Sequence, residues 1–235
     1  MTAPLFHLEP GALAGASAGA EVVFDGAEAR HAAAAMRLAP GEAVLLADGS
    51  GTLGHGTVLA AAPDTVTVRL DTVAEEPAPT PALVLVQALA KGDRDLMAVQ
   101  AAVELGVDAV VPWEAERSIV RWKGPKAAKA RQKWADTARA AAKQARRARV
   151  PAVRDHVSGT AVAGLVRDDD GGRLVLVLHE DAEHGVSAVP AERLSAAVEI
   201  AVVVGPEGGI GPAELVAFGR DSRQISDQAE RTCAC

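Results

Sequence analysis

The chain has 235 residues, of which 49% are hydrophobic, so it is long enough for one large or two modest domains that each bury a core. No uncharged apolar stretch approaches the roughly 20 residues that span a bilayer, and the N-terminus lacks the regions of a secretory signal, which predicts a soluble, cytoplasmic protein without a membrane partner. A formal net charge of −7 argues at first against a nucleic-acid partner.

Residues 1–73 are predicted to form a small β-rich domain. Turn signals such as Pro40-Gly41 and Asp48-Gly49 separate five short candidate strands, and one helix from about Ala27 to Leu38 interrupts them. Short strands in this number favour a compact barrel. The candidate strands are Pro4–Leu8, Glu21–Phe24, Ala43–Ala47, Gly54–Ala60 and Thr65–Leu70.

An acidic, proline-rich stretch at residues 74–81 is predicted to be a stiff linker. Over residues 82–235 strands alternate with helices, which is typical of an α/β domain with a parallel sheet covered on both faces. The expected strands are Leu83–Leu89, Ala109–Pro112, a short piece near Val153, Arg173–Leu178 and Glu199–Val204. The expected helices are Arg94–Leu105, Pro125–Arg147, Thr160–Val166, Ala191–Ala197 and one from about Pro212.

Two strands of this second domain end in loops that are candidates for a binding site. Leu178-His179-Glu180 follows one strand, and Gly205-Pro206-Glu207-Gly208-Gly209 follows another. Ligands bind at the carboxyl ends of the strands in open α/β sheets, and glycines there let a ligand approach the backbone. If the two strands are neighbours, their loops form two walls of one pocket; a tight turn without a ligand is the alternative. Lys91-Gly92-Asp93-Arg94 is a third candidate, although Asp93 is also a good helix N-cap.

Several familiar sites are missing from the chain. It has no G-x-x-x-x-G-K-[ST] loop, no G-x-G-x-x-G fingerprint, no G-x-S-x-G elbow and no His-Glu-x-x-His pair. His179 has no partner at the spacing of a zinc site or a catalytic triad. The only cysteines, Cys233 and Cys235, are too few for a structural zinc site and too close together for an ordinary disulfide. No metal site is predicted.

The negative average charge hides a basic segment. Thirteen basic residues stand between Arg117 and Arg154 against a single acid, Asp136, so the segment carries +12 and the remainder −19. Such a segment attracts phosphate backbones, and a solvated helix face is the alternative. Positive charge also enters the helix of the first domain, through Arg30, His31 and Arg37. For that helix, residue type alone favours a solvent-exposed face over contact with RNA.

Short motifs of the chain, in their order, resemble the ribosomal RNA small-subunit methyltransferase E family of the SPOUT, or trefoil-knotted, class. Each motif is modest, but the ordered set is specific and runs from about residue 5 to residue 217. In the first domain the motifs are Arg30-His31, Met36-Arg37-Leu38 and Pro40-Gly41-Glu42. In the second they are Lys91-Gly92-Asp93-Arg94, Gln100, Glu104-Leu105-Gly106-Val107, Pro112, Glu116-Arg117-Ser118, Trp134, Gln144, residues 147–151, Leu178-His179-Glu180 and Val204 through Gly209.

The resemblance implies an N-terminal PUA-like β-barrel that helps to hold RNA and a C-terminal SPOUT-type domain that binds S-adenosylmethionine and works as a homodimer. The family's reaction is methyl transfer to N3 of one uridine of 16S rRNA in the small ribosomal subunit, so this rRNA is the expected partner. The expected cofactor-binding residues are Leu178, His179, Glu180, Gly205, Pro206, Glu207, Gly208 and Gly209. The expected RNA contacts are Arg30, His31, Arg37, Arg117, Arg147 and Arg149.

The chemistry of this reaction suits a metal-free site. The protein has to align the methyl carbon of the sulfonium with N3 and help to remove the N3 proton, and a nearby guanidinium would stabilise the developing uridine anion. Arg117 and Arg147 are the candidates for this catalytic role. Lys143 and Arg146 stand where the family more often has an acid and a glycine, which adds to the positive charge of the segment.

The likeness to the family is predicted to end after Phe218. Relatives continue there with a strand, a loop and a last helix that complete the knot, whereas residues 219–235 form an atypical polar tail in which Ile225 is nearly the only bulky apolar residue. A truncated or frame-altered ending would leave the knot incomplete and the cofactor pocket without its third wall. Two alternatives follow: an RNA-binding member of the family without catalysis, or a SPOUT methyltransferase with another RNA target.

Overall fold

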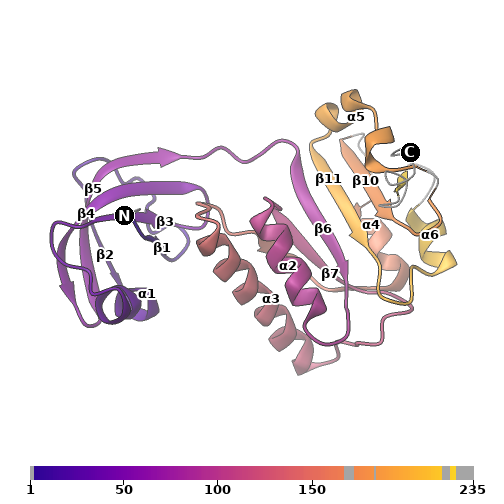
Figure 1. Ribbon diagram of the computed structural model, residues 1–235, viewed down its shortest axis with the longest axis horizontal. Coiled ribbons are helices and arrows are strands. Elements are labelled where there is room, and N and C mark those ends of the chain that lie inside the picture. Colours follow the sequence, from indigo (N-terminus) through magenta and orange to yellow (C-terminus); the bar gives the residue numbers. More distant parts are fainter. Residues whose placement is uncertain (1–2, 167–171, 183, 219–222, 226–235) are drawn as a thin grey trace, which may run out of the picture. The chain divides into compact units, whose positions relative to one another are not determined.

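The computed structural model describes residues 3–166, 172–182, 184–218 and 223–225 (Figure 1). The chain forms two compact units, each with its own sheet and core. Residues 1–78 and 142–150 make the first unit, and residues 79–141 and 151–235 make the second. None of the helices in the described ranges combines the length and the apolar character that a membrane crossing requires.

The first unit is a curled five-stranded sheet whose strands follow the order β1-β3-β4-β5-β2. Strands β1 and β3 are parallel, and the other neighbours are antiparallel. Phe6 and Phe24 belong to the two edge strands of this sheet, yet their ring centroids lie only 5.4 Å apart. The sheet therefore curls around a shared core, as expected for the compact barrel that the sequence predicts. The strands are β1 (Leu5–His7), β2 (Glu21–Asp25), β3 (Ala43–Ala47), β4 (Thr52–Ala62) and β5 (Thr65–Glu75).

The helix expected between Ala27 and Leu38 is shorter and is divided. An α-helical turn, α1 (Gly26–Arg30), passes directly into a π-helical turn, η1 (His31–Ala35). Arg37 has a left-handed backbone with φ 54°, which reverses the chain and ends the helix before Leu38. The predicted helix was too long because the alanine-rich sequence has high helix propensity but contains no signal for this reversal of the chain.

Residues 142–150 pack with the first unit, which the sequence did not indicate. The Val150 N–H donates to the Gly49 carbonyl at 2.9 Å, and Ala148 is fully buried beside Leu45. Lys143 Nζ lies 2.6 Å from a Glu28 carboxylate oxygen. Glu28 therefore neutralises the Lys143 ammonium, and this lysine adds less positive charge to the surface than the sequence suggested.

We expect Gly51→Ala to destabilise the protein more than Gly19→Ala. Both glycines have positive φ, so alanine strains the backbone at both positions. A Cβ at Gly51 would lie within 3 Å of the Arg149 guanidinium, whereas a Cβ at Gly19 would meet nothing within 4 Å. Displacing Arg149 breaks its hydrogen bond to the Glu76 carbonyl, which adds roughly 1.5 to 3 kcal/mol to the loss. Urea unfolding of the two variants measures the difference, and equal midpoints would contradict it.

The second unit is built on a parallel sheet with the strand order β12-β10-β11-β6-β7-β8, in which β9 also pairs with β7. Every pair in it is parallel, as the sequence predicts. The strands are β6 (Ala82–Ala88), β7 (Ala109–Glu114), β8 (Ala152–Val153), β9 (Val157–Ser158), β10 (Arg173–Leu178), β11 (Glu199–Val204) and β12 (Arg223–Ile225).

Helices of the second unit pack on both faces of this sheet (Figure 1). Residues of α4 and α6 share one core cluster with alternate residues of β6, β7, β10 and β11, and Leu194 of α5 packs against a second cluster on the other face. The helices are α2 (Arg94–Glu104), α3 (Pro125–Gln144), α4 (Val162–Val166), α5 (Ala191–Ala196) and α6 (Pro212–Phe218), with short 3-10 turns η2 (Gly159–Ala161) and η3 (Val186–Ala188).

Helix α3 ends three residues before the predicted Arg147. Arg146 has φ 57°, and the Arg147 N–H donates to the Ala142 carbonyl at 2.9 Å. This is the closing bond of a Schellman-type end, in which glycine is the usual left-handed residue. The geometry explains why glycine suits this position, and the arginine here adopts the same conformation.

The tail after Phe218 contributes a short strand to the sheet. Residues 223–225 form β12, which pairs in parallel with β10, and the Ile225 side chain is 5% exposed. Ile225, the one bulky apolar residue noted in this tail, belongs to a core cluster at the sheet edge. The remaining tail, residues 219–222 and 226–235, which includes both cysteines and bears on the knot, lies outside the described residues.

Candidate functional site

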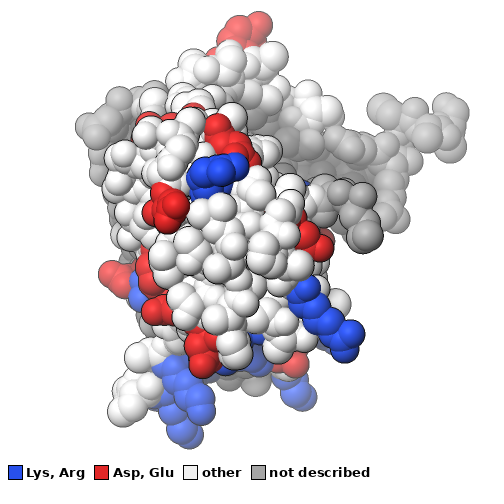
Figure 2. Space-filling view, turned by 90° about the vertical axis from the view of Figure 1, so that its left-hand side faces the viewer, with Lys and Arg blue, Asp and Glu red and all other residues white. Residues whose placement is uncertain are grey.

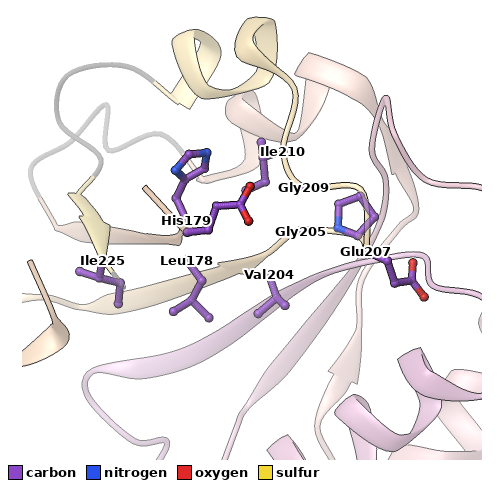
Figure 3. Close-up of a pocket in the computed structure, with 10 residues that line it drawn as sticks. Leu178, His179, Val204, Gly205, Glu207, Gly209, Ile210 and Ile225 are labelled. Atoms are coloured by element: carbon purple, nitrogen blue, oxygen red, sulfur yellow. The ribbon is translucent and has the colours of Figure 1, made fainter. Parts of the chain in front are cut away.

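A pocket of about 500 Å³ opens where β10 and β11 end. The two strands are parallel neighbours in register, so that Leu178 stands beside Val204 and both following loops leave the sheet at the same edge. Figure 3 shows Ile225, Leu178 and Val204 in a row, in the order of their strands. The lining residues are Leu178, His179, Glu180, Val204, Gly205, Pro206, Glu207, Gly209, Ile210 and Ile225. The volume lies within the range of roughly 300–1,000 Å³ that is typical of small-molecule sites.

The structure brings together nearly all the residues that the sequence predicts for a cofactor. Of the eight, only Gly208 is outside the pocket lining. The sequence missed Val204, Ile210 and Ile225, which supply apolar surface. Of these three residues, Val204 could most easily have been predicted, because it is the last residue of a predicted strand that ends at the pocket. Ile210 directly follows the two glycines, but whether its side chain faces the pocket depends on the conformation of the turn, which the sequence does not specify.

The tail contributes one described residue to the pocket, whereas the loop and helix expected to complete its third wall lie outside the described residues. Ile225 lines the pocket, and the His179 N–H donates to the Ile225 carbonyl at 3.0 Å. Strand β12 therefore orders the loop after β10 as well as extending the sheet.

Glu207 connects the pocket to the loop after β6. Its Oε1 accepts the Lys91 N–H and an Arg94 guanidinium N–H, each at 3.3 Å. Its carboxylate points away from His179 (Figure 3). Backbone hydrogen bonds, first from Glu207's own N–H and then from that of Lys91, hold the pKa of this carboxyl below its ordinary value, and the nearby Arg94 charge lowers it further. Glu207 is therefore ionised at neutral pH and fixes the position of the glycine loop.

Asp93 does not have the capping role that the sequence suggested. It occupies the N-cap position of α2 but makes no side-chain cap hydrogen bond. Its Oδ1 instead lies 3.0 Å from Lys133 Nζ of α3. The third candidate segment, residues 91–94, thus contributes contacts to Glu207 and α3 rather than lining the pocket.

Arg117 lies against the glycine loop of the pocket. Its Nη1 donates to the Gly208 carbonyl at 3.0 Å, while the residue as a whole is exposed. A Cβ at Gly209 would lie 3.6 Å from the same nitrogen and 3.8 Å from Glu180 Oε1. The guanidinium is therefore anchored by one hydrogen bond at the rim, and its other N–H groups remain accessible to a substrate.

Besides the Arg117 hydrogen bond, contacts at both ends attach the loop that carries Arg117 to the rest of the second unit. Glu114 Oε2 accepts the Trp122 N–H at 2.9 Å. At the other end, Glu214 Oε1 accepts the Glu116 N–H at 2.7 Å, and Glu214 is 1% exposed. The sequence contains no signal for the second contact, because it joins residues 98 positions apart.

The other predicted RNA contacts belong to the first unit. Arg30, His31 and Arg37 are exposed on and after α1 and η1, and Arg30 lies 3.9 Å from Asp64. Arg147 and Arg149 fall in the segment that packs with this unit, and the Arg147 carbonyl is 2.8 Å from His7 Nε2. On the face drawn in Figure 2, acidic and basic side chains are scattered among uncharged ones.

The arrangement suits binding of a small molecule that has both apolar and polar parts, because apolar side chains and the backbone of two loops line the pocket. Arg117 places a fixed positive charge at the rim, where it can stabilise a developing negative charge. Within the described ranges, no group of histidine, cysteine and acidic side chains is arranged to hold a metal ion.

Two family models match the chain. One, an RNA methyltransferase domain, matches residues 76–226, and the other, an RNA methyltransferase PUA domain, matches residues 24–71. The first match continues to residue 226, eight residues beyond Phe218. These eight residues include the three that form β12.

Known proteins that are named as methyltransferases resemble the chain over most of its length. A ribosomal RNA small subunit methyltransferase E of Mycobacterium bovis is 38% identical over 201 residues, which are 85% of this chain and 76% of that relative. The crystal structure of a ribosomal RNA small subunit methyltransferase E from Neisseria gonorrhoeae, bound to S-adenosyl methionine, has a TM-score of 0.80 and 24% identity, covering 96% of this chain and 89% of that one. A putative methyltransferase from Legionella pneumophila, in complex with the same cofactor, has a TM-score of 0.79 and 25% identity with the same coverage.

Proposed function

The chain belongs to the ribosomal RNA small subunit methyltransferase E family, and from that membership we propose that it uses S-adenosylmethionine to methylate N3 of a uridine in the 16S rRNA of the small ribosomal subunit. The parallel SPOUT-type sheet and the PUA-like domain of the family are both present. The observation that carries the proposal is the pocket at the ends of β10 and β11, with Arg117 at its rim.

The cofactor would bind between the two strand-end loops. Leu178, Val204 and Ile210 would contact its apolar parts, and the backbone of residues 205–209 would receive its polar edge, since glycine leaves backbone groups accessible. The bound cofactor supplies an activated methyl group on a sulfonium. The protein's part is to orient that methyl carbon toward N3 and to exclude water from it.

Of the two catalytic candidates, Arg117 has the stronger structural support. It lies within hydrogen-bonding distance of the glycine loop, so its guanidinium is close to the place where the uridine would meet the cofactor. There it would stabilise the negative charge that develops on the uridine as the N3 proton leaves. Arg147 belongs to the first unit, whose segment 142–150 packs with the barrel.

Besides the RNA contacts predicted from the sequence, we propose contacts with RNA phosphates for cations of the basic segment whose side chains make no hydrogen bond or ion pair within the described residues. Most of the thirteen in the basic segment are already engaged; for example, Arg131 bonds to the Val153 carbonyl and Arg154 to Glu199. Within the described residues, no hydrogen bond or ion pair engages the side chains of Lys123, Lys126, Lys129 and Arg139. Lys126 and Lys129 are exposed three positions apart on α3, so they point in similar directions. We add them to Arg30, Arg37 and the other predicted contacts.

We expect the double variant Lys126→Gln, Lys129→Gln to bind small subunits more weakly and with less salt dependence. Each lost phosphate contact reduces the slope of log affinity against log salt by about 0.7 to 0.9. Lys133→Gln is the matched control on the same helix, because Lys133 is paired with Asp93. Filter binding across a salt series gives the slopes, and an unchanged slope in the double variant would remove these two lysines from the interface.

A homodimer and a cytoplasmic location without a metal requirement complete the proposal. Support for the dimer comes from large apolar side chains that are exposed on the second unit: Met97 is 68% exposed, Leu105 86% and Val216 80%. Exposed apolar surface of this kind is commonly covered by a partner. Light scattering at micromolar concentration measures the mass, and a monomer at all concentrations would contradict the dimer.

The function is tested with unmethylated small subunits and labelled S-adenosylmethionine. We expect label in 16S rRNA and one new stop of reverse transcription, because a methyl group at N3 blocks base pairing. Stops elsewhere would indicate another RNA target. Binding of small subunits without transfer would indicate a catalytically impaired RNA-binding protein, and isothermal titration with the cofactor would then locate the defect.

A further inference from the structure

Glu214 makes contacts that exceed those of a helix cap. It is the third residue of α6 (Pro212–Phe218), and its Oε2 accepts the Gly211 N–H at 3.0 Å, which is the ordinary capping contact of a glutamate at this position. Its other oxygen, Oε1, accepts the Glu116 N–H at 2.7 Å from a different loop. The side chain is 1% exposed, so both hydrogen bonds are made away from water.

These two hydrogen bonds join the two loops that matter for the proposed reaction. Gly211 follows Ile210, which lines the pocket, and Glu116 precedes Arg117, which bonds to the Gly208 carbonyl. The space is filled: a Cβ at Gly211 would lie 2.4 Å from Glu116 Oε2 and 3.2 Å from Glu214 Oε2. Glu214 thus connects the two loops: on one side it bonds to the neighbour of Ile210, and on the other side to the neighbour of Arg117.

We propose that Glu214 is a positioning residue that couples occupation of the cofactor pocket to the placement of the Arg117 guanidinium. The inference rests on the proposed function for its consequence in catalysis. Without the Glu214 carboxylate, the hydrogen bond from the exposed Arg117 guanidinium to the Gly208 carbonyl is the one that still joins the Arg117 loop to residues 205–214 within the described part of the chain. A cation displaced by about 1 Å loses on the order of a hundredfold in rate, so Glu214 affects the chemical step without touching the substrate.

The coupling is tested first without RNA, by hydrogen exchange with mass spectrometry. Adding S-adenosylmethionine to the wild-type protein should slow exchange in peptides that cover 205–211 and also in those that cover 114–118. In Glu214→Gln, where an amide N–H₂ replaces one acceptor, only the first set should respond. If the cofactor slows only residues 205–211 in the wild type, or both sets in the variant, the coupling is refuted.

The catalytic consequence is tested by a double-mutant cycle on the single-turnover rate with small subunits. We expect about a hundredfold to a thousandfold loss for Arg117→Gln and about tenfold or more for Glu214→Gln. The double variant should be no slower than Arg117→Gln alone, because Glu214 acts through Arg117. A merely structural role predicts that the two losses multiply, and that result would overturn the proposal.

A second variant covers the possibility that Glu214→Gln does not fold. Gly211→Ala has an ordinary backbone φ but pushes its methyl group against both carboxylates, and it should also show no further loss when combined with Arg117→Gln. The failure of the proposed function is distinguishable: a wild type that binds the cofactor but transfers no methyl group contradicts that function, whereas the exchange experiment still decides the coupling.

Discussion

Replacing Gly205 by alanine is expected to weaken S-adenosylmethionine binding by roughly tenfold to a hundredfold. The added Cβ would lie 2.7 Å from Ile210 Cγ1. Ile210 is 4% exposed and lines the pocket, so the space into which it can shift is the space that the cofactor would occupy. Overpacking of this kind costs about 1–3 kcal/mol, and a loss of 1.4 kcal/mol in binding corresponds to about tenfold in affinity.

The control for this prediction is Gly164→Ala. Gly164 lies in α4 of the same unit, and a Cβ there would meet nothing within 4 Å. Isothermal titration should give wild-type affinity for this variant and reduced affinity for Gly205→Ala. Equal affinities would show that the loop after β11 adapts freely and does not define the cofactor site.

Arg117→Gln is expected to reduce kcat by about a hundredfold to a thousandfold with a much smaller effect on cofactor affinity. Removal of one preorganised donor from a developing anion typically has this effect. Arg117→Lys should recover only part of the rate, because an ammonium keeps the charge but has no planar fork with which to bond Gly208 and the uridine together.

The control for this prediction is Arg139→Gln, which also removes one positive charge from the basic segment. Arg139 belongs to the same basic segment and is exposed on α3, but it has no contact with the glycine loop. It should keep kcat near the wild-type value in steady-state assays with saturating small subunits. If Arg117→Gln and Arg139→Gln change kcat equally, Arg117 contributes only to the general attraction of RNA.

The sequence predicted the sheets and the pocket well because both depend on local patterns. Runs such as Arg173–Leu178 are strongly apolar and stop abruptly, which marks buried parallel strands, and the residues just beyond them must meet at one edge once the strands are neighbours. The two loops that line the pocket could therefore be named from the sequence. Helix ends were less well predicted, since Arg37 and Arg146 adopt left-handed conformations that arginine rarely signals.

What the sequence could not supply were contacts between distant residues. Glu214 bonds to the Glu116 N–H, and nothing in the spacing of the two indicates it. Strand β12 has three residues and one apolar side chain, too little for a periodic pattern. Such features depend on the assembled fold, and for this reason the sequence did not predict that Ile225 lines the pocket.

The first unit is built from two separate segments of the chain, residues 1–78 and 142–150, which affects how it folds during synthesis and how it can be produced in isolation. Ala148 is buried with Leu5, Leu45 and Ala47, so the nascent barrel leaves the ribosome with part of its apolar surface uncovered until more than sixty further residues have been translated. A fragment cut at the proline-rich stretch should be prone to self-association, and a usable isolated barrel would need residues 142–150 supplied by fusion or as a peptide.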